Sequence, residues 1–541
     1  MSGTIVRPGA GESRSDAGGA RPGGRSSWRT PTMLVIVAAT LVALGLRLLQ
    51  LSRPGYLLGV TEYDDGPYFG SAVDLVHGVI PYRNFILVQP PGITLLMSPA
   101  ALLSKVTGNT ASAMAVGRIL TTLASAAGVF LVGLLLRHRG LVAVIIGCGI
   151  LAVYPDSVST ARTILVEPWL VLFCLLGCLA VFDRDHFASG KRLFWGGVAF
   201  GFAGAIEVWA IFPVIVLAAL MLPRLGHLAR YIGGVAVGFL VPVVPFVAID
   251  PKRFYQSLYV AQVAPRAGSK RVPLWIRLKN MLGLVHIHTS GTLIALAALV
   301  LVAFIIVVIM ASWMISGHGP ALLDWFALAT TVIIVANFLW PDQFHYHFSA
   351  FLAPFLALAI ALPVARLLSD LQQRATKSQA PAARTLTQVT AGLAGLVFLL
   401  FGVSQAAFES HLNLRMSPIA AGADRIIPKG ACVATDQVSY LLLSNRFLTN
   451  VPGCSRMIDG LGSDLAFSNG LKPGTGAGQV QAVRTMWLDA FKHAQFVWLS
   501  YNAYRRVAWS PPLKAYFKAN FVTALKHGGH DTIYKRITTH G

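Results

Sequence analysis

Residues 61–92 read TEYDDGPYFGSAVDLVHGVIPYRNFILVQPPG and separate two apolar segments near the start of the chain. The stretch is polar and acidic, although 55% of the 541 residues are hydrophobic and only 12% are charged. Average soluble domains carry about 25% charged residues. Apolar runs of about 20 residues, long enough to cross a bilayer, recur on both sides of the stretch. We therefore expect a polytopic α-helical membrane protein in which residues 61–92 form a polar loop between helices.

The charge pattern predicts how the chain is oriented in the membrane. Lys and Arg number 44 and Asp and Glu 22, which gives a formal net charge of +22. In a membrane protein this excess indicates cytoplasmic loops and anionic lipid rather than nucleic acid. Residues 1–32 have no apolar core and are expected to form a disordered cytoplasmic tail, not a signal peptide. Residues 52–112 then form the first external loop. The arginines of the tail are Arg7, Arg14, Arg21, Arg25 and Arg29.

A membrane domain of about eleven spans is expected between residues 33 and 408. The spans are 33–51, 113–136, 141–154, 164–182, 193–206, 208–222, 231–249, 292–315, 321–340, 348–368 and 386–407. The apolar piece 93–106 is expected to lie at the membrane surface, because a crossing there would place Arg137 and Arg139 outside. Two spans are shorter than a bilayer requires and are expected to be tilted or packed inside the bundle.

Residues 409–541 alternate between strand-like and helix-like patterns, which predicts a small extracytoplasmic α/β domain. Strands are expected at 431–435, 446–450, 495–500 and 531–536, and helices at 436–445 and 511–521. Cys432 and Cys454 fall in this region and could form a disulfide if it lies outside the cytoplasm. The other three of the five cysteines lie in apolar runs, and no pair has the spacing of zinc ligands.

The polar loop carries residues of the types that catalysis requires. Asp64 and Asp65 precede Pro67, so that one of them could simply cap a helix. Adjacent carboxylates also repel each other, which raises the pKa of one toward the value that a general base needs. Both interpretations stay open. Arg83 could hold a phosphate or be a surface charge, and Gln89 offers an amide before two prolines.

These features resemble the first external loop of the GT-C membrane glycosyltransferases, such as the protein O-mannosyltransferases and the aminoarabinose transferases of lipid A. The acidic pair is followed by an aromatic residue, an amphipathic segment, the pattern G-x-x-P-Y-R-[DN]-F and Pro-Pro before an apolar helix. ARTILVEP, with Arg162 and Glu167, and FHYHF, with His345, Tyr346 and His347, extend the resemblance. The chain departs from the family at Asp65, where many relatives carry Glu, at Val88-Gln89 and at Glu207, where some carry Lys.

The resemblance implies an enzyme that transfers a monosaccharide from a polyprenyl-phosphate donor by inverting displacement on the outer face of the membrane. The acceptor would be a cell-envelope glycan, glycolipid or protein. Asp64 is the implied general base, with Asp65 as its rival. Arg83 and Arg162 are candidate phosphate contacts, and Gln89, His345 and Tyr346 are candidate substrate-binding residues. Glu167 is a candidate acceptor or metal ligand, or merely opens a helix.

Cofactor, partners and location are expected from the same argument. A divalent cation is a candidate cofactor, because the leaving phosphate needs positive charge. Membrane lipids are expected partners and nucleic acid is not. The basic loop 250–289 could bind anionic headgroups or acceptor phosphates, or only be solvated; its cations are Lys252, Arg253, Arg266, Lys270 and Arg271. A bacterial plasma membrane is expected, since the Gly-, Ala- and Arg-rich composition is compatible with a high-GC genome.

Two other classes of function are compatible with parts of the sequence. A transporter or lipid flippase would explain the many spans and the basic charge. It predicts internal repeats and ionisable residues within the spans, whereas the chain shows no repeat and places its acids in an external loop. A non-catalytic envelope scaffold, with the α/β domain as a binding module, is the third interpretation.

Overall fold

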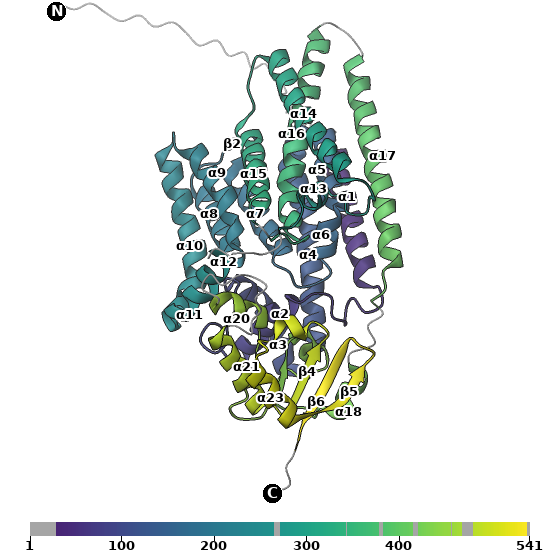
Figure 1. Cartoon of the computed structure of the whole chain (residues 1–541). Helices are drawn as coiled ribbons and strands as arrows, with labels where there is room; N and C mark the ends of the chain where they lie inside the picture. The colour runs from purple at the N-terminus through teal and green to yellow at the C-terminus, as the bar shows by residue number, and fades with distance from the viewer. Residues whose placement is uncertain are drawn as a thin grey trace, which may run out of the picture.

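The computed structural model describes residues 29–263, 271–341, 343–377, 382–414, 420–455, 457–467 and 480–537. Most of the predicted tail, and Arg266 and Lys270 of the predicted basic loop, lie outside these ranges. A long bundle of helices carries a smaller α/β domain at one end, and the described part of the chain enters the bundle at the opposite end (Figure 1).

Seven described helices are long and apolar enough to cross a membrane. They are α1 (Arg29–Leu51), α4 (Thr110–Leu136), α10 (Leu225–Ile249), α14 (Gly291–Ser316), α15 (Leu322–Leu339), α16 (Phe348–Lys377) and α17 (Ala382–His411). The other four predicted spans form the shorter helices α5 (Leu141–Val153), α7 (Glu167–Val181), α8 (Lys191–Ile206) and α9 (Ile211–Met221). All eleven predicted spans are therefore helical, and the number that crosses the bilayer stays a prediction.

The short helices differ from the predicted spans in their ends and in their surroundings. The span expected at 164–182 begins only at Glu167, because Pro168 favours the first turn of a helix. Helix α9 is preceded by the 3₁₀ turn η2 (Val208–Ala210), and α4 is followed by η1 (Arg137–Arg139). Side chains of α7 and α8 are buried against neighbouring helices, so that these helices need not match the thickness of the bilayer by themselves.

Helices α8 and α10 approach each other closely along two pairs of glycines. A Cβ at Gly197 or Gly201 would overlap backbone atoms of α10, and one at Gly234 or Gly238 would overlap backbone atoms of α8. Small residues four apart on both helices allow this approach, as in other membrane helix pairs.

We expect Gly234→Leu to destabilise the protein by about 1–3 kcal/mol or more, because the side chain would have to displace the backbone at Phe194. The adjacent Gly233 has open space at its Cβ position, so Gly233→Leu is the matched control and should leave stability unchanged. Thermal unfolding in detergent, followed by size-exclusion chromatography, measures both variants. Equal midpoints for the two would show that the glycine contact does not hold the pair.

Two helices lie across the end of the bundle nearest the α/β domain. The polar loop forms α2 (Asp65–Val76), and the apolar piece after the prolines forms α3 (Gly92–Thr107). They pack against each other beneath α4 (Figure 1). The short helix α6 (Pro155–Thr160) lies between α5 and α7.

The described part of the predicted basic loop 250–289 is mostly helical. It contains α11 (Pro251–Tyr255), the π-helix η3 (Gln256–Val260), α12 (Ala261–Val263) and α13 (Leu274–Met281). Asp250 begins α11, because its carboxylate accepts a hydrogen bond from the backbone amide of Arg253 at 3.0 Å.

The C-terminal domain contains a four-stranded sheet in the order β3-β4-β6-β5, with β3 parallel to β4 and the other pairs antiparallel. The strands are β3 (Val433–Thr435), β4 (Phe496–Ser500), β5 (Phe521–His527) and β6 (Asp531–Arg536). The helices are α18 (Ala420–Ile426), α19 (Val438–Leu443), α20 (Gly460–Phe467), α21 (Gln481–His493), α22 (Ala503–Arg506) and α23 (Pro511–Asn520). A disulfide joins Cys432 to Cys454, as the sequence analysis considered possible.

Two expectations for this domain were wrong. Residues 446–450 do not form a strand, since only Thr449 forms an isolated bridge, to Gly430. The side chain of Arg446 instead donates hydrogen bonds to nearby backbone carbonyls, including that of Ser444 at 3.0 Å. The sequence also did not predict β5, because Phe521 was assigned to the preceding helix, which ends at Asn520.

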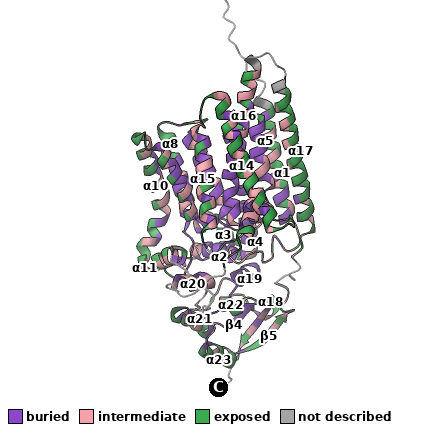
Figure 2. Cartoon of the chain, turned by 45° about the horizontal axis from the view of Figure 1, so that its top comes forward, coloured by how far each residue is buried: buried purple, intermediate pink, exposed green. Residues whose placement is uncertain are grey.

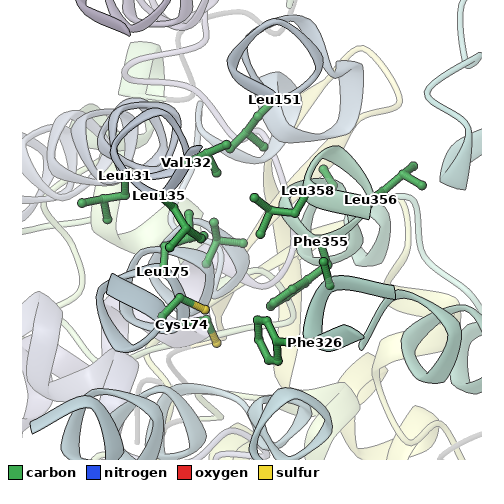
Figure 3. Close-up of a cluster of buried hydrophobic side chains, with 14 of the residues drawn as sticks. Leu131, Val132, Leu135, Leu151, Cys174, Leu175, Phe326, Phe355, Leu356 and Leu358 are labelled. Carbon is green, nitrogen blue, oxygen red and sulfur yellow. The ribbon is translucent and has the colours of Figure 1, made fainter. Parts of the chain in front are cut away.

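The main hydrophobic core fills the bundle, and a second core joins α2 and α3 to the C-terminal domain. Figure 3 shows part of the first, where Leu135 of α4 lies beside Leu175 of α7 and faces toward α16 with Phe355. Buried residues gather inside the bundle and at the junction with α19, whereas α14 and α17 expose apolar faces (Figure 2). These exposed faces are the surfaces expected to meet lipid.

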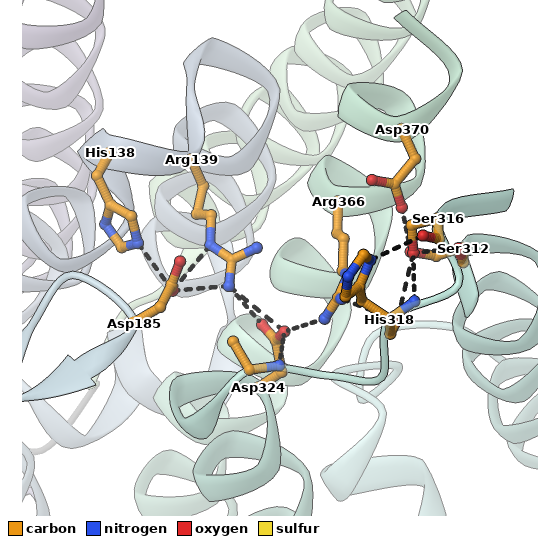
Figure 4. A network of polar contacts seen from close by, with 10 residues as sticks. His138, Arg139, Asp185, Ser312, Ser316, His318, Asp324, Arg366 and Asp370 are labelled. Carbon is orange, nitrogen blue, oxygen red and sulfur yellow. Dashed lines mark hydrogen bonds and ion pairs between the residues drawn. The ribbon is translucent and has the colours of Figure 1, made fainter. Parts of the chain in front are cut away.

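A network of ion pairs closes the end of the bundle opposite the C-terminal domain (Figure 4). Arg139 pairs with Asp185 at 2.7 Å and with Asp324 at 3.1 Å, and Arg366 pairs with Asp324 at 3.2 Å. Asp185 lies in the turn between the short strands β1 (Phe182–Asp183) and β2 (His186–Phe187). The network fastens this turn and the start of α15 to α4 and α16.

Candidate active site

The two adjacent aspartates of the polar loop have different surroundings. Asp65 is fully buried at the first position of α2, and its carboxylate pairs with the buried guanidinium of Arg118 at 2.5 Å. Hydroxyls of Thr163 and Ser439 donate to it at 2.7 and 2.6 Å, and that of Thr61 at 3.1 Å. These contacts occupy both carboxylate oxygens and fix Asp65 among the first loop, α4 and the C-terminal domain.

The carboxylate of Asp64 is partly exposed and makes no hydrogen bond or ion pair within the described ranges, and it does not cap α2. Burial raises its pKa to about 7. The positive field of His347 opposes this rise, while the negative charges of Asp459, Glu62 and Glu167 add to it. A carboxylate in this state can accept a proton near neutral pH.

Glu62, Arg162 and Tyr346 form a contact chain beside Asp64. The carboxylate of Glu62 lies 3.3 Å from the guanidinium of Arg162 and accepts a hydrogen bond from the hydroxyl of Tyr346 at 2.5 Å. The guanidinium of Arg162 also lies over the ring of Tyr56, 5.2 Å from its centroid. The structure therefore brings two predicted substrate-binding residues, Arg162 and Tyr346, to Glu62 of the polar loop.

Glu167 pairs with His347 rather than with His345. The carboxylate of Glu167, at the first position of α7, lies 2.5 Å from Nδ1 of His347. Burial lowers the pKa of His347, but the attraction of Glu167 outweighs it and raises the pKa to about 9. His347 is therefore a cation at neutral pH. His345 is exposed and stacks on His347, with 5.5 Å between ring centroids.

A small cavity borders Glu167. It is lined by Ser125, Leu151, Ser157, Thr160, Glu167, Pro168, Val171 and Ala350. The second carboxylate oxygen of Glu167 and the hydroxyl of Ser157 are buried without a partner in the described part of the chain. Buried polar atoms of this kind are usually hydrated, so the cavity has the lining expected of a water site.

Gln89 adds an amide to this region, and Glu207 adds another buried carboxyl group. The amide nitrogen of Gln89 donates to the hydroxyl of Tyr68 at 3.0 Å, and its backbone carbonyl accepts from Tyr82 at 2.5 Å. Glu207 lies between the end of α8 and the 3₁₀ turn η2 that precedes α9. Burial and the neighbouring Glu167 raise the pKa of Glu207 to about 8. The sequence identified Glu207 only as a departure from the family pattern.

Arg83 lies apart from these residues. Its side chain is exposed and makes no ion pair with a described carboxylate, and its backbone carbonyl accepts a hydrogen bond from Arg253 at 2.7 Å. The described contacts of Arg83 therefore do not support its predicted role as a phosphate contact beside Asp64 and Asp65.

The C-terminal domain supplies side chains that the sequence did not identify. The hydroxyl of Tyr63 donates to Asp459 at 3.1 Å, and the guanidinium of Arg506 lies 4.5 Å from the centre of its ring. The amide of Gln437 donates to the backbone carbonyl of Glu62 at 3.0 Å. These contacts join residues 375–396 positions apart in the sequence and hold Glu62 and Tyr63, the two residues before Asp64, in place.

Among the described residues, no group of three or more His, Cys, Asp or Glu side chains has a geometry that could hold a metal ion. One carboxylate oxygen of Glu167 binds His347. The divalent cation stays an untested expectation.

Comparisons with known proteins agree with this architecture. Two crystal structures of ArnT from Cupriavidus metallidurans, one apo and one bound to undecaprenyl phosphate, match 94% of the chain with TM-scores of 0.58 and 0.56. Sequence identity is 13% and 14%, and the matches cover 98% and 99% of ArnT. The chain has the GT-C fold. The family model of glycosyltransferase family 87 matches residues 88–341. No curated protein matches the sequence.

The match to family 87 covers α3 to α15, which includes Arg162, Glu167 and Glu207 but stops short of His347. Together with the GT-C fold it supports a multi-pass membrane glycosyltransferase. Asp64 lies outside the matched range, so that its role depends on the surroundings described above.

Proposed function

We propose that the protein transfers a monosaccharide from a polyprenyl-phosphate-sugar donor to a cell-envelope glycan, glycolipid or protein on the extracytoplasmic face. The observation that carries this proposal is the unpaired carboxylate of Asp64, with a pKa of about 7, in the field of His347. A second cation, Arg162, is held by the nearby Glu62. The fold shared with ArnT, which binds undecaprenyl phosphate, supports a lipid-phosphate donor.

Asp64 acts as the general base. It takes the proton of the acceptor hydroxyl as the oxygen attacks the anomeric carbon, and the bond from that carbon to the phosphate oxygen breaks. One displacement inverts the anomeric configuration. The phosphate leaves as an anion and needs no general acid, so that a single carboxylate is sufficient.

Positive charge stabilises the departing phosphate. Arg162 is held by Glu62 and stacked on Tyr56, and His347 is kept protonated by Glu167. Cations that are already oriented cost little reorganisation when negative charge develops on the leaving group. Asp65 takes a different role, since its contacts are all made within the protein and it positions the first turn of α2.

The charge distribution supports an extracytoplasmic site. Arg137 and Arg139 follow α4 at the end of the bundle opposite the C-terminal domain. Arg366 of α16 joins Arg139 in the network of ion pairs shown in Figure 4. Loops rich in Lys and Arg stay in the cytoplasm.

The direct test supplies purified protein with a panel of radiolabelled polyprenyl-phosphate sugars and an envelope glycolipid extract. Transfer by the wild type, but not by Asp64→Asn, is the expected result and identifies the sugar. Lipid that is bound or moved across vesicles without any transfer would contradict the proposal and favour a flippase.

The pH dependence of transfer should be bell-shaped. The base must be deprotonated, so kcat/KM should rise with pH through about 7, the pKa of Asp64. His347 must be protonated, so the rate should fall as pH passes about 9. Glu207 titrates near 8, and Glu207→Gln is therefore the control that should keep the lower limb near 7. A lower limb that moves in Glu207→Gln would assign the base to Glu207 instead.

A further inference from the structure

An exposed surface of basic and aromatic side chains lies where α10 leaves the bundle. We define this basic-aromatic surface by Arg83, Lys252, Arg253, Tyr255 and Tyr259, all of which are exposed. The rings of Tyr255 and Tyr259 stack with 5.0 Å between centroids and remain 55% and 51% exposed. Large aromatic side chains exposed together indicate a binding surface.

Its position places this surface at the boundary of the membrane. The outer face of α10 exposes apolar side chains along its length. Val241 is 68% exposed, and Ile249, the last residue of the helix, is 43% exposed. Helix α11 begins at Pro251, at the foot of α10 in Figure 1. Lys252 and Tyr255 are three residues apart in α11 and share one of its faces, and Tyr255 stacks on Tyr259 of η3. Tyrosine and lysine that directly follow a lipid-facing helix are typical of the headgroup level.

The surface is built on fixed contacts. Arg253 donates from Nη1 to the backbone carbonyl of Arg83 at 2.7 Å, which fixes the guanidinium of Arg253 against the segment that carries Arg83. Phe254 packs on the buried ring of Tyr82, with 4.8 Å between centroids, and Tyr82 holds a left-handed backbone with φ of 67°. The amide of Gln262 donates to the carbonyl of Val88 at 2.7 Å. The surface is therefore attached to the segment that carries Gln89.

The charges of the surface are mostly uncompensated. Asp250 is the one carboxylate with a described contact to it, and it lies 3.8 Å from Nε of Arg253. In the described ranges no carboxylate forms an ion pair with Arg83 or Lys252. Guanidinium groups bind phosphate oxygens in pairs, and each basic residue near an anionic membrane adds about fivefold to the affinity.

We propose that the basic-aromatic surface binds the phosphate headgroup of an anionic phospholipid in the leaflet that faces the site. The phosphate contacts Arg83, Lys252 and Arg253, while the two tyrosines lie among the headgroups. This site is separate from the proposed donor site and does not depend on it. It gives a role to Arg83, whose side chain makes no ion pair with a described carboxylate.

Native mass spectrometry of the full chain in detergent tests the proposal. The wild type should retain phosphatidylglycerol in preference to phosphatidylcholine. The triple variant Arg83→Gln, Lys252→Gln, Arg253→Gln should bind phosphatidylglycerol at least tenfold more weakly. The matched control is Lys514→Gln, Lys518→Gln, Lys526→Gln, which removes the same charge from exposed positions of the C-terminal domain and should bind as the wild type does.

A second titration with a polyprenyl phosphate separates this surface from the donor site. Unchanged binding of polyprenyl phosphate by the triple variant, with loss of phosphatidylglycerol, supports the proposal. Equal loss of both lipids would make the surface part of the donor site and overturn it. Equal retention of phosphatidylglycerol by the triple variant and the wild type would also overturn it. Because the readout is lipid binding, these outcomes stand whether or not sugar transfer is detected.

Discussion

Asp64→Asn is expected to lower the rate of sugar transfer by about 10²–10⁴-fold, the contribution that a positioned general base usually makes. The amide keeps the shape of the side chain but cannot accept the proton of the acceptor hydroxyl. The loss should fall mainly on kcat, because the carboxylate acts on the reacting proton and the donor phosphate is contacted by other groups. Initial rates with a radiolabelled donor at pH 8 measure the effect.

The same variant should be at least as stable as the wild type. The raised pKa of Asp64 means that its ionised form is disfavoured in the folded protein, so that ionisation lowers stability as pH rises past the unfolded pKa. A neutral asparagine removes this cost. Loss of transfer with an unchanged or higher unfolding temperature therefore assigns a catalytic role, as a trade-off between stability and function predicts. A lower unfolding temperature together with lost transfer would instead make Asp64 structural.

The sequence predicted those parts of the structure that depend on local patterns. Runs of apolar residues identified the helices of the bundle, and the acidic pair before Pro67 identified the start of α2. Local patterns are weakest where a segment needs a partner. Residues 446–450 have the composition of a strand, but Asn445 adopts a left-handed backbone with φ of 56°, and no neighbouring strand extends the single bridge at Thr449.

The roles within the acidic pair depend on residues that are remote in the sequence. Arg118 and Ser439, which pair with Asp65, are 53 and 374 residues away from it. Arg118 lies within an otherwise apolar helix, where a charged residue is itself a signal of a buried partner. Arg118 was therefore a sequence signal of a buried ion pair, although our sequence analysis did not predict this pair. The contacts from the C-terminal domain to Glu62 and Tyr63 had no sequence signal.

Breaking the ion pair of Asp65 and Arg118 should have the largest effect on stability. Arg118→Met is expected to destabilise the protein by about 3–5 kcal/mol, because it leaves the carboxylate of Asp65 buried without its counter-ion. The guanidinium also donates to the backbone carbonyls of Tyr56, Leu57 and Gly59, at 2.8–3.0 Å, and these would lose their partner. Asp65→Asn should destabilise the protein similarly by leaving the guanidinium unpaired.

The double variant Asp65→Asn, Arg118→Met separates the pair from its surroundings. If the cost of each single change comes from an unpaired buried charge, the double variant should be less destabilised than the sum of the two. The exposed pair Arg192 and Asp183, 3.7 Å apart with side chains 50% and 71% exposed, is the matched control. Asp183→Asn should change stability by less than about 1 kcal/mol.

Unfolding rates at elevated temperature in detergent are the suitable measurement, because large membrane proteins often unfold irreversibly. Transfer should fall together with stability in both single variants of the buried pair, since Asp65 orients the turn that carries Asp64 and does not touch the reacting atoms. Additive effects in the double variant would show that the two side chains act independently. An Asp65→Asn protein with wild-type stability and no transfer would move the general base from Asp64 to Asp65.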